Sequence, residues 1–181
     1  MDLKSKIILI SGPTASGKSK AALKIAKKLN GEIINADSMQ VYKELKILTA
    51  RPSKTDLNKI DHHLYGFRSV KKEFSSGEWL KLAKKNIKKI RDKNKIPVLV
   101  GGTGLYFKAL TDGLVKIPKI PISVRDKIRR MQNKLGQKKF YLKLLNNDPL
   151  VKNKIDPTDV QRSIRAYEVI KFTKKSVFSW Y

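Results

Sequence analysis

A glycine-rich turn between an apolar run and an amphipathic segment constrains the fold of this chain more than any other feature of its sequence. The turn, Gly12-Pro-Thr-Ala-Ser-Gly-Lys18-Ser19, has the pattern of a phosphate-binding P-loop. Residues 6–11 before it predict a buried strand, and residues 19–30 after it have the apolar spacing of a helix. Such a loop binds phosphate through its backbone N–H groups, its lysine and the helix N-terminus, and its serine hydroxyl can hold Mg²⁺. We therefore expect the chain to bind an oligophosphate.

Strand and helix signals continue to alternate through the first part of the chain. Further strands are predicted at residues 32–36, 63–67 and 96–100. Gly31 is expected to cap the end of the first helix. Ser75 and Glu78 form a capping box in front of a helical stripe, and another helix is expected to begin at Leu105. This alternation favours an α/β fold, with a P-loop NTPase-like parallel sheet covered by helices.

The strand signals stop near residue 115. A linker with several prolines, residues 116–121, leads into segments with helical spacing. These segments are residues 124–135, 137–146 and 158–173. Asp156, followed by Pro157, is expected to cap the last of them. We therefore place an α/β core at residues 1–115 and an all-helical segment at residues 116–181.

The acid that usually accompanies a P-loop is missing. In P-loop ATPases and GTPases a second apolar strand ends in an aspartate that helps to hold Mg²⁺, but residues 96–100 end in Gly101-Gly-Thr-Gly104. Asp37 instead follows a predicted strand, at the carboxyl edge of the sheet where ligands bind. Three roles are open to it: a Mg²⁺ ligand through water, a general base toward an acceptor, or a helix N-cap. Thr103 either reaches the same anion or belongs to a turn that serves only tight packing.

The composition excludes several chemistries. There are no cysteines, which excludes disulfides, cysteine-bound metals and thiol nucleophiles. The two histidines are neighbours, His62 and His63, and we expect them to be hydrogen-bonded strand or loop residues. Forty-one Lys and Arg against 15 Asp and Glu give a net charge of +26, which attracts polyanions. A coding sequence of low GC content would also produce this excess, because 33 of the 41 are lysines.

The last predicted helix carries a polar face that has two interpretations. Gln161 and Arg165 lie four residues apart on this face, with Arg162 beside them. The face either contacts phosphates and bases or is a solvated surface paired with Glu168. Core packing, rather than base stacking, is expected for the aromatic residues Trp79, Tyr106, Phe107 and Tyr167.

Six segments of the chain resemble the tRNA dimethylallyltransferase family, whose members are also called tRNA isopentenyltransferases or IPP transferases. They are GPTASGKS (12–19), NADSMQVYK (35–43), TARPS (49–53), DHHL (61–64), GGTGLYFKAL (101–110) and DPTDVQRSIRAYEV (156–169). Their order and spacing match the family over essentially the whole chain. The resemblance implies transfer of the dimethylallyl group of dimethylallyl diphosphate to N6 of an adenosine next to the anticodon of tRNA, with release of diphosphate and with Mg²⁺ as cofactor.

The resemblance also implies a role for each matching residue. Asp37 would be the general base, and Thr103 would join it as a catalytic residue. Diphosphate would be bound by Gly12, Pro13, Thr14, Ala15, Ser16, Gly17, Lys18 and Ser19, with Ser19 also a Mg²⁺ ligand. The tRNA would be contacted by Asp37, Ser38, Met39, Gln40, Thr103, Arg125, Gln161, Arg162, Ser163, Ile164 and Arg165. Arg51 and Tyr106 would support the site.

The expected partners and length follow from the same resemblance, and the expected location follows from the apolar runs of the sequence. We expect tRNA, through its anticodon stem-loop, and dimethylallyl diphosphate as partners of a cytoplasmic monomer. No membrane association is expected, because no apolar run approaches the ~18 residues that span a bilayer. Family members have roughly twice the length of a single domain, so we expect an incomplete core and a truncated helical tRNA-binding insertion. The alternatives are a small-molecule kinase using ATP, a prenyltransferase acting on free adenine nucleotides, and a non-catalytic RNA-binding fragment.

Overall fold

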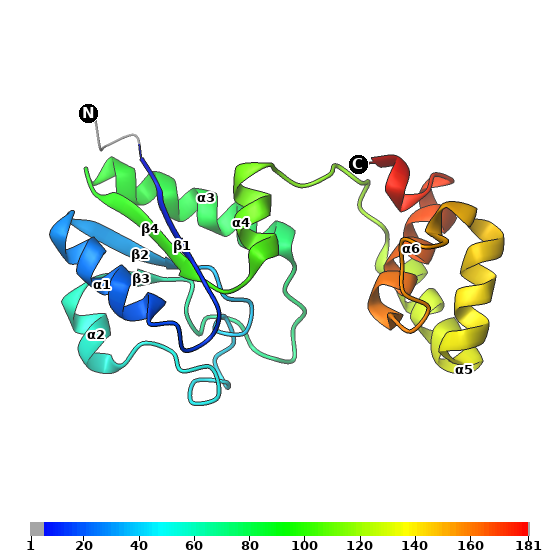
Figure 1. Cartoon of the computed structure of the whole chain (residues 1–181), viewed down its shortest axis with the longest axis horizontal. Coiled ribbons are helices and arrows are strands. Elements are labelled where there is room, and N and C mark those ends of the chain that lie inside the picture. Colours follow the sequence, from blue (N-terminus) through cyan, green and yellow to red (C-terminus); the bar gives the residue numbers. More distant parts are fainter. Residues whose placement is uncertain (1–5, 181) are drawn as a thin grey trace. The chain divides into compact units, whose positions relative to one another are not determined.

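The computed structural model describes residues 6–180 and divides into two compact units (Figure 1). The division falls between Leu114 and Val115, one residue from the boundary expected from the sequence. The first unit contains the sheet, and the described part of the second contains helices and no strand. Within residues 6–180, no helix combines the length and the apolar character needed to cross a membrane.

The first unit contains a four-stranded sheet in which all pairs are parallel, with the order β1-β4-β2-β3. Its strands are β1 (Ile8–Ser11), β2 (Gly31–Asn35), β3 (His62–His63) and β4 (Ile96–Gly101). In the register of the sheet, Ile33 of β2 pairs with Val98 on one side and His62 on the other. The expected α/β fold with a parallel sheet is confirmed.

The third strand is shorter and begins earlier than the predicted segment, residues 63–67. Leu64 (φ 64°) and Gly66 (φ 53°) adopt a left-handed backbone, which cannot continue an extended strand. Parallel pairing resumes only at an isolated bridge between Tyr42 and Arg68. The predicted strand boundary is therefore wrong, because two positions in it turn the chain.

Helices cover both faces of the sheet because successive strand residues point to opposite sides. On one face α1 (Lys18–Lys28) forms a small core whose buried members are Ala22, Ala26, Ile33, Val98 and Val100. On the other face lie α3 (Ser76–Asp92) and α4 (Gly104–Thr111), which pack against Ile34 and Leu99. Figure 1 shows these layers, with the short helix α2 (Lys54–Lys59) preceding β3.

Gly31 does not cap α1, contrary to the sequence prediction. The capping residue is Leu29, and Asn30 takes the left-handed conformation with φ 50°. Asparagine tolerates this conformation better than other non-glycine residues. Gly31 is instead the first residue of β2, where an added Cβ would lie 2.6 Å from the carbonyl oxygen of Ile96. The glycine therefore serves close strand packing rather than helix termination.

The capping box in front of α3 is confirmed. The Ser75 hydroxyl accepts a hydrogen bond from the Glu78 N–H at 3.2 Å, and the Ser75 N–H donates to the Glu78 carboxylate at 3.1 Å. The next residue, Trp79, is fully buried and stacks on Tyr106 with ring centroids 4.3 Å apart. Its indole N–H donates to the carbonyl of Asn35 at 2.8 Å. The capping box therefore fixes a helix that is tied directly to the end of β2.

The second unit is built around a helical hairpin. Its main helices are α5 (Ile122–Asn147) and α6 (Val160–Thr173), with short 3₁₀ helices η1 (Pro149–Val151) and η2 (Val177–Trp180). Gly136, with φ 72° and ψ 163°, breaks α5 at the point between the two helices predicted from the sequence. Phe140 and Tyr167 pack together in the core, with ring centroids 5.2 Å apart.

The N-cap of α6 is Asp159 and not Asp156. The Asp159 carboxylate accepts a hydrogen bond from the Arg162 N–H at 2.9 Å. Asp156 accepts hydrogen bonds from the N–H and the hydroxyl of Thr158, at 2.7 and 2.6 Å, and so stabilises the turn before the helix. Both aspartates satisfy local donors, and sequence alone does not reveal which of them begins the helix.

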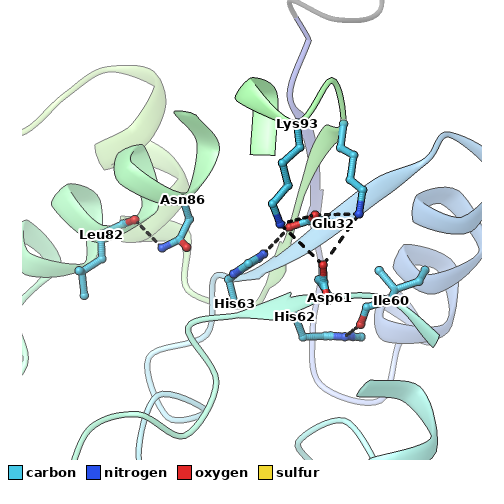
Figure 2. Close-up of polar contacts among 9 residues, drawn as sticks. Glu32, Ile60, Asp61, His62, His63, Leu82, Asn86 and Lys93 are labelled. Carbon is cyan, nitrogen blue, oxygen red and sulfur yellow. Dashed lines mark hydrogen bonds and ion pairs between the residues drawn. The ribbon is translucent and has the colours of Figure 1, made fainter. Parts of the chain in front are cut away.

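A fully buried carboxylate lies near the amino ends of β2 and β4 (Figure 2). Glu32 Oε1 lies 2.9 Å from Lys95 Nζ and 3.0 Å from Lys93 Nζ, and its Oε2 lies 2.7 Å from His63 Nε2. The exposed Asp61 lies 3.8 Å from both lysines. The prediction that the histidines are hydrogen-bonded strand residues is confirmed by this contact and by the 2.7 Å contact of His62 with the Ile60 carbonyl.

These contacts outweigh the cost of burying the charge. Burial alone would raise the pKa of Glu32, but hydrogen bonds with Lys95, His63 and Lys93 lower it from 4.5 to about 2. A carboxyl group whose pKa is depressed in the folded state stabilises the fold above its unfolded pKa. That contribution is lost as the pH falls from about 4.5 toward about 2.

We expect Glu32→Gln to lower the free energy of unfolding at pH 7 by about 3 kcal/mol, because a pKa lowered from 4.5 to about 2 corresponds to that energy. Urea unfolding followed by circular dichroism at pH 7, and at steps from pH 5 to pH 2, measures the effect. The variant should lack the acid-dependent loss that Glu32 contributes in this window. Asp61→Asn, which removes an exposed carboxylate near the same lysines, should cost less than about 1 kcal/mol. Equal effects of the two substitutions would contradict this account.

Candidate functional site

The P-loop connects β1 to α1, and most of its residues are exposed. Gly17 (φ 79°) is the N-cap of α1, and Ala15 (φ 64°) also adopts a left-handed backbone. The Lys18 ammonium donates a hydrogen bond to the Pro13 carbonyl at 2.7 Å, which bridges the loop. The first turn of α1 contains no acidic residue, so its positive end is not neutralised locally. This geometry suits an anion bound by the loop.

The glycine turn after β4 brings the P-loop and Asp37 to one place. An added Cβ at Gly102 would lie 3.5 Å from the Gly12 carbonyl oxygen and 3.8 Å from Asp37 Oδ2. An added Cβ at Gly101 would overlap the carbonyl group of Ala36. The close approach of β4 to the backbone after β2 therefore requires a position without a side chain at Gly101, whereas a Cβ at Gly102 would make only ordinary contacts with Gly12 and Asp37. The predicted P-loop and Asp37 do lie at the same edge of the sheet.

Asp37 is held by its own neighbours and by no helix. Its N–H donates to the Asn35 side-chain oxygen at 2.9 Å, and the Asn35 amide donates to the carbonyls of Asp37 and Leu64 at 2.9 and 3.0 Å. Asp37 Oδ1 accepts the Met39 N–H at 2.8 Å. The next helix is α2, whose N-cap is Ser53. The helix N-cap role is therefore excluded, and Oδ2 is the carboxylate oxygen beside Gly102.

Thr103 links the glycine turn to the segment after Asp37. Its N–H donates to the Ala36 carbonyl at 3.2 Å, and its hydroxyl accepts the Ser38 N–H at 2.9 Å. Thr103 is the N-cap of α4 by position, but its side chain makes no capping hydrogen bond. The hydroxyl therefore positions Ser38 instead of the helix. Farther along, the Gln40 amide donates to the Thr49 carbonyl at 2.7 Å, while Met39 is exposed.

A resident metal centre made by protein side chains alone is not present in the described residues, because no three His, Cys, Asp or Glu side chains gather there. Mg²⁺ is commonly held by one or two carboxylates together with substrate phosphates. The Ser19 hydroxyl on the P-loop and the Asp37 carboxylate at the same edge are donors of the kind such an ion uses. The residues present therefore fit an ion that is shared with a bound diphosphate.

The candidate RNA residues of the second unit divide into two groups. Gln161, Arg162 and Arg165 are exposed on α6. Ser163 and Ile164 are buried, and the Ser163 hydroxyl accepts a hydrogen bond from the Gln137 amide at 3.1 Å. The side chains of Ser163 and Ile164 are therefore part of the helical core in this structure, whereas the resemblance implies that these two residues contact tRNA.

One buried carboxylate pairs with two of the candidate arginines. Glu168 Oε1 lies 3.5 Å from Arg125 Nε, and its Oε2 lies 3.4 Å from Arg165 Nη1. The pairing with Glu168 that the alternative interpretation of this face expects is therefore present at Arg165. Gln161 and Arg162 remain on the surface, and Arg162 makes an exposed ion pair with Asp159 at 3.5 Å.

Sequence reasoning missed two residues beside this face. An open pocket of about 620 Å³ is lined by Lys154, Ile155, Arg162, Arg165, Ala166, Val177 and Phe178. The Lys154 ammonium lies 4.8 Å from the centre of the Phe178 ring. No periodic pattern connects positions 154 and 178, which the fold alone brings together around α6.

We expect Gly101→Ala to lower the free energy of unfolding by about 1–3 kcal/mol or more, because the added methyl group overlaps the backbone of Ala36. Gly104→Ala is the matched control, since a Cβ there meets nothing within 4 Å and the residue begins α4. The control should be neutral or slightly stabilising. Thermal and urea unfolding of both variants measure the difference. A Gly101→Ala protein as stable as the control would show that the strand ends are not held this closely.

Comparison with known proteins agrees with this geometry. The family model described as IPP transferase matches residues 40–181. The chain is 64% identical over 180 residues to a tRNA dimethylallyltransferase of Pelagibacter ubique, covering 99% of this chain and 58% of the relative. It is 49% identical over 174 residues to one of Rickettsia massiliae, covering 96% and 48%. The chain thus spans about half the length of the curated relatives it matches.

Solved structures give the same result. A eukaryotic dimethylallyltransferase acting on tRNA matches with a TM-score of 0.78 and 31% identity, over 94% of this chain and 42% of that chain. The full-length tRNA isopentenylpyrophosphate transferase of Bacillus halodurans matches with a TM-score of 0.61 and 36% identity, over 95% and 57%. On these matches and on the geometry of its P-loop edge, the chain belongs to the IPP transferase family.

Proposed function

We propose that this chain carries the donor site and part of the acceptor site of an enzyme that transfers a dimethylallyl group from dimethylallyl diphosphate to N6 of an adenosine next to the anticodon of tRNA. The observation that carries the proposal is the convergence of the P-loop, Gly102 and the Oδ2 atom of Asp37 at one sheet edge. The relatives named above are tRNA dimethylallyltransferases, which supports the same donor and acceptor. Since the acceptor is tRNA, we also propose that the enzyme acts in the cytoplasm. We propose a monomer because the net charge of +26 opposes self-association.

The P-loop binds the diphosphate of the donor. Its exposed N–H groups, the N-terminus of α1 and the Lys18 ammonium stabilise the negative charge that grows on the leaving group as the allylic C–O bond breaks. Ser19 would hold Mg²⁺ against the diphosphate, and the ion would add charge stabilisation to the leaving group. Because diphosphate simply leaves, this reaction requires no positioned hydrolytic water.

Asp37 acts on the acceptor. The adenosine N6 attacks the allylic carbon, a C–N bond forms, the C–O bond to diphosphate breaks, and N6 gives up one proton. Asp37 Oδ2 accepts that proton, while Oδ1 is already engaged by the Met39 N–H. The Thr103 hydroxyl fixes Ser38 beside this carboxylate. Asp37 is thereby held in one orientation, as a general base requires.

The proposed RNA contacts are found in each of the two units. Ser38, Met39 and Gln40 line the space after Asp37, and the target base leaves its stack to reach it, as is general for base-modifying enzymes. In the second unit, Arg125 and Arg165 share one carboxylate, so the group retains a net positive charge for phosphate. Arg162 and Gln161 add exposed donors on the same helix.

We expect a non-reactive analogue of dimethylallyl diphosphate to bind this chain with Mg²⁺ and tRNA present, and to bind better than ATP. Lys18→Ala should weaken that binding roughly tenfold or more, because a charged donor to the diphosphate is lost. Lys20→Ala, which removes an exposed lysine of the same helix, should have little effect. Isothermal calorimetry measures all three. A preference for ATP would instead support the kinase alternative, and equal affinities of the two variants would contradict the P-loop assignment.

We expect Asp37→Asn to reduce the single-turnover rate of transfer to tRNA ~100-fold or more, since the general base is removed without a change in shape. Binding of the tRNA, measured by filter retention, should change little. Asp92→Asn, an exposed carboxylate at the end of α3, is the control. Undiminished transfer by Asp37→Asn would exclude Asp37 as the base.

A further inference from the structure

The loop that follows the Asp37–Gln40 segment displays two large aliphatic side chains in water. Ile47 is 92% exposed and Leu48 is 86% exposed, which is more than any other large apolar residue in the described chain. We name residues 43–51 the apolar-tip loop. Side chains of this kind are ordinarily buried, and neighbouring exposed apolar residues on an ordered loop mark a surface that is covered during function.

The loop is braced at both ends, so its exposed tip is not the result of loose chain. At one end the Glu44 carboxylate accepts hydrogen bonds from the Ser69 hydroxyl and the Val70 N–H at 2.9 and 3.1 Å. At the other end the Arg51 guanidinium donates to the Lys43 carbonyl at 3.0 Å. The guanidinium lies against Gly66, where a Cβ would overlap it.

The interior of the loop is also hydrogen-bonded. The N–H and hydroxyl of Thr49 both donate to the Leu45 carbonyl, at 3.1 and 2.6 Å, and the Ala50 N–H donates to the Ile47 carbonyl at 3.1 Å. Each of these bonds holds the turn closed without using the side chain of Ile47 or Leu48. The turn therefore presents both side chains outward on a rigid support.

The same bonds place the loop beside the acceptor site. Gln40, the last of the residues expected to line the base pocket, donates to the Thr49 carbonyl at 2.7 Å. The apolar-tip loop therefore follows residues 37–40 closely in the sequence, and the Gln40–Thr49 hydrogen bond ties it to them in space. Figure 1 shows the chain after β2 looping at the end of the sheet where the P-loop also lies.

We propose that Ile47 and Leu48 form an apolar wedge that packs against unstacked bases of the RNA acceptor and keeps the target nucleotide beside Asp37. This inference rests on the proposed function, since it takes RNA as the substrate. Apolar side chains inserted between bases stabilise an opened stack, and contacts with base faces tolerate any sequence. The charge of the loop favours this occupant, because Lys43, Lys46 and Arg51 accompany a single acid, Glu44.

Two other occupants fit the loop less well. A second copy of the chain would bring a net charge of +26 against a basic loop, so repulsion opposes self-association. The dimethylallyl group is a small apolar tail that is held near the P-loop by its own diphosphate. A dimethylallyl group carries no charge, so it would not interact with the lysines beside Ile47 and Leu48. A nucleic acid supplies phosphates for the lysines and base faces for the apolar side chains.

The test uses the full chain and an anticodon stem-loop RNA with 2-aminopurine next to the target adenosine. Fluorescence of this base rises when it unstacks, so the wild-type chain should raise it on binding. Ile47→Ser/Leu48→Ser should reduce the rise several-fold and weaken binding about tenfold. The slope of log affinity against log salt should stay unchanged, because no cation is lost. Lys43→Gln/Lys46→Gln should show the opposite pattern, with a smaller slope and the fluorescence rise retained at saturation.

The control is Leu57→Ser, which polarises a 42% exposed leucine on α2 of the same unit and should leave both readouts unchanged. Circular dichroism checks folding, and the single variants Ile47→Ser and Leu48→Ser keep the test decisive if the double variant unfolds. If the wild-type chain binds the RNA and the double variant shows the same affinity and the same fluorescence rise, the wedge is overturned and the proposed function is not. A wild-type chain that binds no RNA overturns the wedge and the proposed function together. If the double variant binds the dimethylallyl diphosphate analogue more weakly, the tip contacts the dimethylallyl group and the wedge is overturned. If the wild-type chain is a dimer and the double variant is not, the tip contacts a second copy of the chain and the wedge is likewise overturned.

Discussion

The site depends on the contact between the glycine turn of β4 and the backbone that follows β2. The Ala36 N–H donates to the Val100 carbonyl at 2.8 Å, and the Ala36 carbonyl accepts the Thr103 N–H at 3.2 Å. Gly101 lies between these two bonds, where any side chain would overlap Ala36. Pairing of the two strands therefore extends beyond their regular ends. It carries Asp37 to the position where Gly12 and Gly102 also lie, so the chemistry depends on an absent side chain.

The two ends of the sheet use charge in different ways. At the amino end, Glu32 is fully buried, and Lys93, Lys95 and His63 satisfy both of its oxygens. At the carboxyl end, most residues of the P-loop are exposed, and the local turn after Asp37 engages only one of its carboxylate oxygens. Parallel sheets bind ligands at their carboxyl ends. A satisfied ionic cluster at the far end stabilises the strands without competing for the ligand.

Regular periodicity made most of the fold predictable, while single-residue conformations did not follow from it. The strand–loop–helix around the P-loop, the capping box at Ser75 and the helix break near Gly136 are each marked by several residues acting together. By contrast, the left-handed backbone at Leu64 shortened β3, and Asn30 took the turn expected of Gly31. These choices depend on partners that are distant in sequence, such as the Ile96 carbonyl that excludes a side chain at Gly31.

The candidate site was predictable where its residues belong to a compact motif, and less so where exposure decides their role. The family resemblance grouped Gln161 through Arg165 as one set, but a helix turns successive residues to different sides, so Ser163 and Ile164 enter the core. The apolar-tip loop was not anticipated either, because an aliphatic pair in a sequence ordinarily indicates burial. The exposure of Ile47 and Leu48 in the structure shows that both are directed outward, and the hydrogen bonds of Leu45, Thr49 and Gln40 brace the loop that carries them.

Two arginines of the second unit, Arg125 and Arg165, stabilise the fold whether or not a ligand is bound. A buried carboxylate without partners is very costly, and Glu168 avoids that cost through Arg125 and Arg165. Replacing either arginine would therefore disturb the helical core together with any RNA contact. Arg162 differs, because its ion pair with Asp159 is exposed and contributes little stability. Of the arginines assigned to RNA, Arg162 is thus the one at which recognition can be separated from folding.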